Sequence, residues 1–174
     1  MAISAQQLYI KRATAPILLD AEMNEVDWTL AEVANRFKQY FPSDTAYAVA
    51  QSEVRLTYDD NFIYILAKME NLGPRKYVAP SSRRDYRGEG NDGITVVIDT
   101  FRDRTNGFMF GVNPFGVQRE GLIANGGSSG ENLSLNWDNK WYAKSKLYDT
   151  YWIAEMAIPF NSIRFNEGET EWYI

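Results

Sequence analysis

Apolar and polar residues alternate along several short runs of this sequence, and this period of two constrains the fold more than any other feature. In residues 53–58, for example, Val54, Leu56 and Tyr58 share one face while Glu53, Arg55 and Thr57 share the other. Successive side chains of a β-strand point to opposite faces, so this pattern is typical of a half-buried strand. The chain is therefore expected to fold mainly from strands.

Other runs of the same kind predict further strands, with turn residues between them. They cover residues 62–69, 94–99, 108–113, 141–147 and 152–158. Residues 62–69 are apolar on both faces, which predicts a central strand that forms a hairpin with residues 53–58. Many short strands at close spacing favour two packed layers. The predicted fold is an all-β antiparallel β-sandwich, jelly-roll-like, with one or two short helices.

Helical spacing is confined to short segments. Asn24 is expected to cap a helix in which Val26, Leu30 and Val33 recur at helical spacing, and a second short helix is expected after Pro159. Residues 71–93 and 114–139 show neither period and are predicted to be irregular. Loops of that length inside a compact domain are usually functional or mobile, so candidate binding residues are sought there.

The sequence contains no histidine and no cysteine. Catalysis by Ser-His-Asp or Cys-His groups, imidazole or thiolate metal sites and disulfides are therefore excluded. Paired carboxylates that cleave a glycosidic bond remain as a chemical alternative, with Glu120, Glu131 and Glu155 available. A small sandwich more often binds than cleaves, so we predict a protein without catalytic residues of its own.

The 174 residues are enough for one domain, and we expect residues 1–174 to form it. The formal charge of −5 gives no long-range attraction to nucleic acid, which argues against a nucleic-acid partner. No apolar stretch approaches the length of a membrane helix, and the first residues lack a signal-peptide pattern. Because the last residues, 171–174, read as the middle of a strand, we expect a fragment truncated at its C-terminus.

The two irregular stretches hold aromatic and planar polar side chains of the kind that bind sugars. Sugar rings present C–H faces that pack on aromatic rings, while arginine and acidic side chains read the hydroxyl groups. We predict a carbohydrate site from these residue types, and the candidates are Tyr86, Arg84, Trp137, Arg119 and Glu120. Trp141 opens an alternating run and is better explained as a core residue.

Five segments, in order, resemble the carbohydrate-binding module family 9-like β-sandwich. They are residues 18–28 with Asp20 and Trp28, the hairpin 54–64, residues 92–99, residues 110–113, and residues 152–165 with Glu155 and Ile158-Pro159-Phe160. The resemblance covers nearly the whole chain and implies a non-catalytic module that binds oligo- or polysaccharide in a larger protein of carbohydrate catabolism. Residues 99–104 and 113–119 look closer to a Gram-negative subgroup in which the module precedes an outer-membrane-barrel-like region. That resemblance implies a secreted, periplasmic or outer-membrane-associated full-length protein.

The family's sugar-binding positions are changed in this chain. Its stacking aromatic falls on Glu89, its glutamate on Thr95 and an arginine of the next strand on Gly111. A structural or docking domain, packed against a C-terminal domain of its own chain and without a sugar ligand, is therefore the alternative function. The resemblance also implies a calcium site at Asn71 and Asp92, and calcium is the one cofactor expected.

Overall fold

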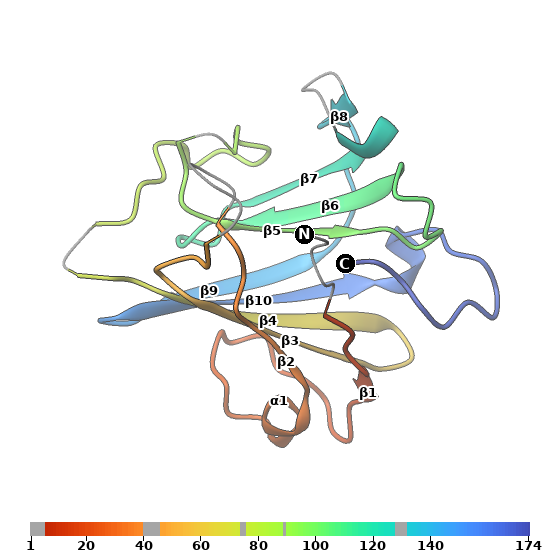
Figure 1. Ribbon diagram of the computed structural model, residues 1–174, viewed down its shortest axis with the longest axis horizontal. Helices are drawn as coiled ribbons and strands as arrows, with labels where there is room; N and C mark the ends of the chain where they lie inside the picture. The colour runs from red at the N-terminus through yellow and green to blue at the C-terminus, as the bar shows by residue number, and fades with distance from the viewer. Residues whose placement is uncertain (1–5, 40–45, 74–75, 89, 128–131) are drawn as a thin grey trace.

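Two β-sheets stack face to face in the computed structural model, which describes residues 6–39, 46–73, 76–88, 90–127 and 132–174 (Figure 1). The predicted sandwich is therefore confirmed. Within the described residues the larger sheet has the strand order β1-β3-β4-β10-β9, with β2 also paired to β3, and the smaller sheet has the order β5-β6-β7-β8. All described strand pairs are antiparallel except β1 and β3, which run parallel.

The predicted strands occur close to their expected bounds, and short additional ones accompany them. In the larger sheet the strands are β1 Lys11–Arg12, β2 Val33–Ala34, β3 Ser52–Tyr58, β4 Phe62–Glu70, β9 Tyr142–Leu147 and β10 Tyr151–Pro159. In the smaller sheet they are β5 Ile94–Ile98, β6 Gly107–Val112, β7 Gln118–Ile123 and β8 Leu133–Ser134.

Strand β4 lies at the centre of the larger sheet, between β3 and β10. Its alternate residues are buried on opposite faces: Ile63 and Ile65 contact the core between the sheets, while Tyr64 and Leu66 contact a second apolar cluster on the outside. This double burial explains why residues 62–69 are apolar at almost every position. The predicted hairpin and the predicted central strand are both confirmed.

The main core fills the space between the two sheets. Leu56, Ile65 and Met156 from the larger sheet meet Ile98 and Phe110 from the smaller one, and each is at most 5% exposed. Burying large apolar side chains of this kind stabilises a fold by about 1.5 to 3 kcal/mol each. This core fixes the relative position of the two sheets and of the loops at their ends.

An N-terminal segment covers part of the outer face of the larger sheet. It contains the helix α1, Val26–Leu30, which lies on the side of this sheet that faces away from the smaller one (Figure 1). Ala21 and Trp28 of this segment are fully buried against Tyr64 and Ile153. The outer face of β4 and β10 is therefore apolar because it is covered.

The helix differs from the one predicted around Asn24. Glu25, not Asn24, is the residue before the first turn, and its carboxylate accepts a hydrogen bond from the Leu18 amide rather than capping the helix. The helix ends at Leu30 because Val33 already belongs to β2, and Val26 and Leu30 are 55% and 54% exposed. The face that this short helix buries is defined by Trp28.

Residues 114–139, predicted to be irregular, contain β7, the short 3-10 helix η1, Asn125–Gly127, and β8. That prediction was wrong because the side chains of β7 that point into the sandwich include Gln118 and Glu120, so the strand lacks an apolar face. The second predicted helix is the 3-10 turn η3, Phe160–Ser162. Residues 71–93 contain no strand in their described part.

Among the residues that the structure describes, no helix has the length and apolar character needed to cross a membrane.

Candidate functional site

Arg84 and Glu120, two residues that the sequence singled out, are brought together at the edge of β7. Nε and Nη2 of Arg84 both donate to Oε1 of Glu120, the former at 3.1 Å. Glu120 is fully buried, whereas the side chain of Arg84 is 41% exposed. Burial by itself lowers the pKa of Arg84, but the hydrogen bonds and the charge of Glu120 raise it above its ordinary value. The guanidinium of Arg84 therefore stays charged at the surface while it is bound to the buried carboxylate of Glu120.

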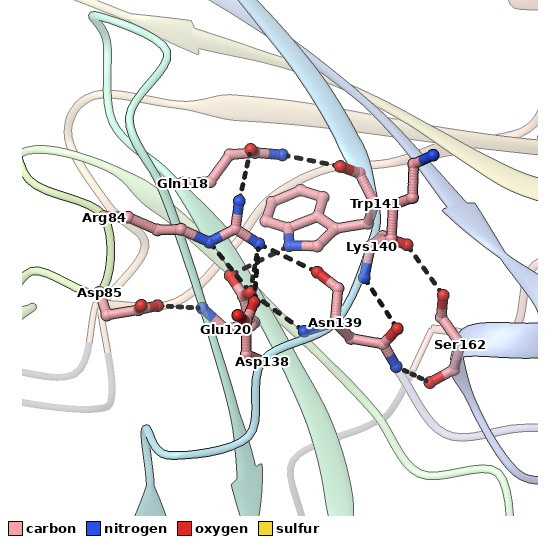
Figure 2. A network of polar contacts seen from close by, with 9 residues as sticks. All are labelled: Arg84, Asp85, Gln118, Glu120, Asp138, Asn139, Lys140, Trp141 and Ser162. Carbon is pink, nitrogen blue, oxygen red and sulfur yellow. Dashed lines mark hydrogen bonds and ion pairs between the residues drawn. The ribbon is translucent and has the colours of Figure 1, made fainter.

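Both carboxylate oxygens of Glu120 are engaged by neighbouring groups in the described structure. Its Oε2 accepts a hydrogen bond from Nε1 of Trp141 at 3.1 Å, and its Oε1 also accepts a longer one from the amide of Asn139 (Figure 2). Trp141 is 3% exposed and belongs to the main core, as the sequence predicted. A buried carboxylate needs such partners, because a charge left unpaired away from water is costly. Glu120 therefore fixes the positions of Arg84, Trp141 and Asn139 through hydrogen bonds from the interior.

The loop that carries Arg84 is fastened to the edge of β7. The amide of Asp85 donates to the carbonyl of Gln118 at 3.1 Å. The amide of Glu120 donates to Oδ1 of Asp85 at 3.3 Å (Figure 2). Gln118 also accepts from Arg84 through its side chain. These contacts pair an irregular segment with a strand edge, which positions Arg84 more firmly than a free loop would.

Tyr86 and Arg119 form a second pair, on the outer face of the smaller sheet. The guanidinium carbon of Arg119 lies 5.5 Å from the centre of the Tyr86 ring, a cation–π geometry. Both residues are 6% exposed. Burial raises the pKa of Tyr86, and the nearby charge of Arg119 opposes that change only in part. Tyr86 therefore does not present an open ring face to a sugar in this structure, because the ring packs over Arg119.

The family's sugar-binding positions lie beside Arg119. Thr95 and Gly111 are direct partners across β5 and β6, and Arg119 is the partner of Gly111 across β6 and β7. A Cβ atom on Gly111 would lie 2.8 Å from Cγ of Arg119, so the arginine side chain occupies the space above this glycine. The arginine expected on β6 is thus replaced by one from the neighbouring strand. Glu89 lies outside the described residues.

Trp137 is partly buried and packs against the main core. Its ring lies 5.5 Å from that of Phe108 and 5.8 Å from that of Phe110. Trp137 therefore contacts the core with its ring and is only partly available to a ligand from the loop in which it lies. The predicted site residues form two pairs, Arg84 with Glu120 and Tyr86 with Arg119, and one tryptophan beside the core.

An open depression of about 410 Å³ lies next to Arg84. Its lining consists of Arg84, Asp138, Asn139, Lys140 and Trp141. Nδ2 of Asn139 donates to the carbonyl of Ser162, and Oγ of Ser162 donates to the carbonyl of Lys140, so this loop is held in place as well (Figure 2). Sequence reasoning missed Asp138, Asn139 and Lys140; their position next to Trp137 in a polar loop was the available signal.

The carboxylates that could have formed a glycosidase pair are not arranged as one. Glu120 lies between the two sheets with Trp141, whereas Glu155 lies under the N-terminal segment on the opposite face of the larger sheet. Glu155 is fully buried, so its place in an alternating run is not explained by a solvated face. Glu131 lies outside the described residues. Glu120 and Glu155 therefore do not face each other across one cleft.

The calcium site expected at Asn71 and Asp92 stays a prediction. One carboxylate oxygen of Asp92 accepts a hydrogen bond from the Val78 amide at 2.7 Å, and the amide of Asn71 donates to the carbonyl of Thr150. The described residues contain no group of three or more acidic side chains placed to hold a metal ion. Calcium prefers six to eight oxygen ligands, so these two residues alone do not make a site.

The fold is shared with solved structures of carbohydrate-binding modules. A family 9 carbohydrate-binding module from Caldicellulosiruptor kristjanssonii in complex with glucose matches 90% of this chain and 71% of its own length, with a TM-score of 0.60 and 18% identity. The same module in complex with cellotriose matches 88% and 67%, again with a TM-score of 0.60 and 18% identity. A proposed carbohydrate-binding protein from Bacteroides uniformis matches 88% and 72%, with a TM-score of 0.64 and 13% identity.

No family model and no curated protein matches the sequence. The resemblance to family 9 carbohydrate-binding modules is therefore confirmed at the level of the fold, which these structures share with the chain. At identities below 20% the comparison does not carry individual site residues across. The site must be argued from the geometry of this chain.

Proposed function

We propose that this domain is a non-catalytic carbohydrate-binding module. Its fold is that of family 9 carbohydrate-binding modules solved in complex with glucose and with cellotriose. The observation that carries the proposal in this chain is the exposed guanidinium of Arg84, which is fixed by buried Glu120 at the edge of an open polar depression. A preorganised polar group of this kind loses little freedom on binding, and binding sites depend on that property.

The depression offers the groups that sugar hydroxyls need. Lys140 is a donor and Asp138 is an acceptor with an 86% exposed side chain. Arg84 and the amide of Asn139 add the donor and acceptor capacity that their contacts within the protein leave over. Each hydrogen bond to a sugar replaces one to water, so the net gain per bond is about 0.5 to 1.5 kcal/mol. We therefore propose a module of modest affinity that recognises a short stretch of an oligo- or polysaccharide.

Isothermal titration calorimetry with glucose, cellotriose and a wider oligosaccharide panel tests this function. The unmodified domain should bind at least one member of the panel, and Asp138→Ala should weaken that binding by about threefold to tenfold. Asp138 is exposed, so this change should leave the fold intact. Lys144→Gln, on the far face of the larger sheet, is the control. The absence of binding to every member of the panel would overturn the proposal.

The cellular context belongs to the same proposal. A carbohydrate-binding module without catalytic groups serves a larger protein, and we infer a secreted, periplasmic or outer-membrane-associated protein of carbohydrate catabolism. Fractionation of cells that produce the full-length gene product would test this location. Recovery of that product only in the cytoplasm would contradict it.

A docking domain is the second candidate, and one observation favours it. Leu18, Val26 and Leu30 of the N-terminal segment are each more than half exposed. Exposed apolar side chains of this size are a feature of protein interaction surfaces. We infer that this surface packs on another part of its own gene product. Val26→Ser with Leu30→Ser should then lower the melting temperature of the full-length product but not that of this domain alone.

A further inference from the structure

Four cationic side chains around the candidate site have no acidic partner in the described part of the chain. They are Arg83, Arg87, Arg119 and Lys140, none of which forms an ion pair with another described residue. Two of the three neighbouring described carboxylates are already in use: Glu120 is bound to Arg84 and Trp141, and Asp85 accepts from the amide of Glu120. The third, Asp138, is exposed and its nearest cation is Arg84, at 3.7 Å. The cations gather in a chain whose formal charge is −5. Among the described residues of this region, five cations (Arg83, Arg84, Arg87, Arg119 and Lys140) therefore face three carboxylates (Asp85, Glu120 and Asp138), the reverse of the balance in the whole chain.

Arg119 is the most informative of the four, because it is only 6% exposed. A guanidinium carries five N–H donors. The contacts made by that of Arg119 are a long hydrogen bond to the sulfur of Met109, at 3.6 Å, and the face of the Tyr86 ring. Its Nε is buried without a hydrogen-bond partner. Buried charges are normally paired, so this group is a donor set that lacks an acceptor.

An exposed glycine lies directly against this guanidinium. Gly88 is exposed and lies over Arg119, so closely that a Cβ atom on Gly88 would be 2.1 Å from Nη1 of the arginine. No side chain of residue 88 can cover the charge. An acceptor on a ligand would reach Arg119 where the backbone at Gly88 moved aside.

The other cations lie around the same strand edge. Arg83 and Arg87 are exposed and flank the segment that Asp85 fastens to β7, while exposed Lys140 lines the depression together with Arg84. Arg119 is on β7 itself, between Gln118 and Glu120, the two residues that Asp85 contacts. Cations on the loop, on the strand and in the depression therefore surround one short stretch of β7.

We propose that this stretch recognises the anionic groups of an acidic glycan, whose carboxylate or sulfate oxygens supply the acceptors that these cations lack. The proposal rests on the carbohydrate-binding function and names its substrate class. Guanidinium groups pair with planar carboxylates through two parallel hydrogen bonds, which makes arginine the preferred partner for such groups. A polymer of acidic sugars carries repeated charges and is able to contact the loop and the depression together.

Calorimetry with three short oligosaccharides of different charge tests the proposal. Trigalacturonate carries carboxylates, a sulfated carrageenan oligosaccharide of similar length carries sulfates, and cellotriose is neutral. At least one acidic ligand should bind about tenfold or more tightly than cellotriose at about 50 mM salt, and this advantage should shrink at about 500 mM because salt screens exposed charges. The tighter of the two acidic ligands identifies the anionic group.

Two variants locate the effect. Arg83→Gln with Arg87→Gln removes two exposed charges and should weaken acidic binding by about threefold to tenfold, with cellotriose binding unchanged. Arg119→Gln should weaken acidic binding by a similar factor, with circular dichroism to show that the sheets are retained. Lys144→Gln removes a cation from the far face of the larger sheet and should change neither affinity.

The outcomes separate this inference from the function on which it rests. Binding of cellotriose that equals or exceeds binding of both acidic ligands would overturn the inference and leave the carbohydrate-binding function in place. The acidic ligands could also bind more tightly, but with an affinity that Lys144→Gln lowers as much as the double variant Arg83→Gln with Arg87→Gln does. That result would overturn the inference as well, because the affinity would then depend on the total charge of the protein. If none of the three ligands binds, the inference is overturned. If no member of the whole oligosaccharide panel binds, the proposed carbohydrate-binding function is overturned as well.

Discussion

The indole Nε1 of Trp28 donates a hydrogen bond of 3.1 Å to Oε1 of Glu155, and this contact fastens the N-terminal segment to the larger sheet. The amides of Asp20 and Ala21 donate to the other oxygen of the same carboxylate, at 3.0 and 2.9 Å. Glu155 is fully buried. Burial raises the pKa of this carboxyl to about 7, although the three hydrogen bonds oppose the change.

The raised pKa of Glu155 predicts a domain that loses stability as the pH rises. The folded state favours the protonated acid, whereas the unfolded chain titrates near 4.5. The stabilisation is therefore fully present below pH 4.5 and is lost between about pH 4.5 and pH 7. Two to three pKa units correspond to about 3 kcal/mol in the free energy of unfolding. Urea unfolding at several pH values between 4.5 and 8 measures this loss.

Glu155→Gln provides the comparison, because glutamine keeps an acceptor oxygen but does not titrate. This variant should show a much flatter dependence of unfolding free energy on pH over the same range. Equal pH dependence in the two proteins would show that other groups are responsible.

The pair formed by Arg84 and Glu120 predicts an asymmetric effect of substitution on stability. Arg84→Ala leaves a fully buried carboxylate without its cation and should lower the free energy of unfolding by about 2 to 3 kcal/mol. Arg84→Lys keeps the charge and should recover part of the loss. Chemical denaturation measures both, and an effect of Arg84→Ala below about 0.5 kcal/mol would contradict a stabilising role for the pair.

The close approach of Gly88 to Arg119 predicts that a side chain at position 88 is poorly tolerated. Gly88→Val should displace the guanidinium from Tyr86 and lower the free energy of unfolding by about 1 to 3 kcal/mol, as overpacked substitutions do. Because the clash is with Arg119, combining Gly88→Val with Arg119→Ala should cost less than the sum of the single changes. Additive costs in this double-mutant cycle would place the clash elsewhere.

The helix α1 predicts a contrast between its buried and exposed residues. Trp28→Ala empties a fully buried site and should cost about 3 to 5 kcal/mol of unfolding free energy. Val26→Ser and Leu30→Ser alter exposed positions and should each stay within about 0.5 kcal/mol of the unmodified domain. Thermal melting compares the three, and a large loss from Leu30→Ser would show that this residue is buried in solution.

The strands with an apolar inner face were predictable, because burial on one face imposes alternation on the sequence. Strand β7 was not, since Glu120 and Gln118 point inward and find polar partners there that no local pattern reveals. The candidate residues Arg84 and Glu120 could be selected by type, but their contact joins residues 36 positions apart and depends on how the loop lies along β7. Burial of Tyr86 was equally unpredictable, because it depends on contact between its loop and Arg119 of β7.

The N-terminal segment over the larger sheet also limits how a polymer can approach the molecule. Ala21 and Trp28 cover the outward side chains of Tyr64, Leu66 and Ile153. A polysaccharide cannot lie flat on these strands, because it would first have to displace the N-terminal segment that Glu155 binds. A saccharide chain docked at β7 therefore meets the opposite side of the sandwich from this cover. Attachment to a resin or sensor surface through the covered side would leave that docking edge pointing toward the solution.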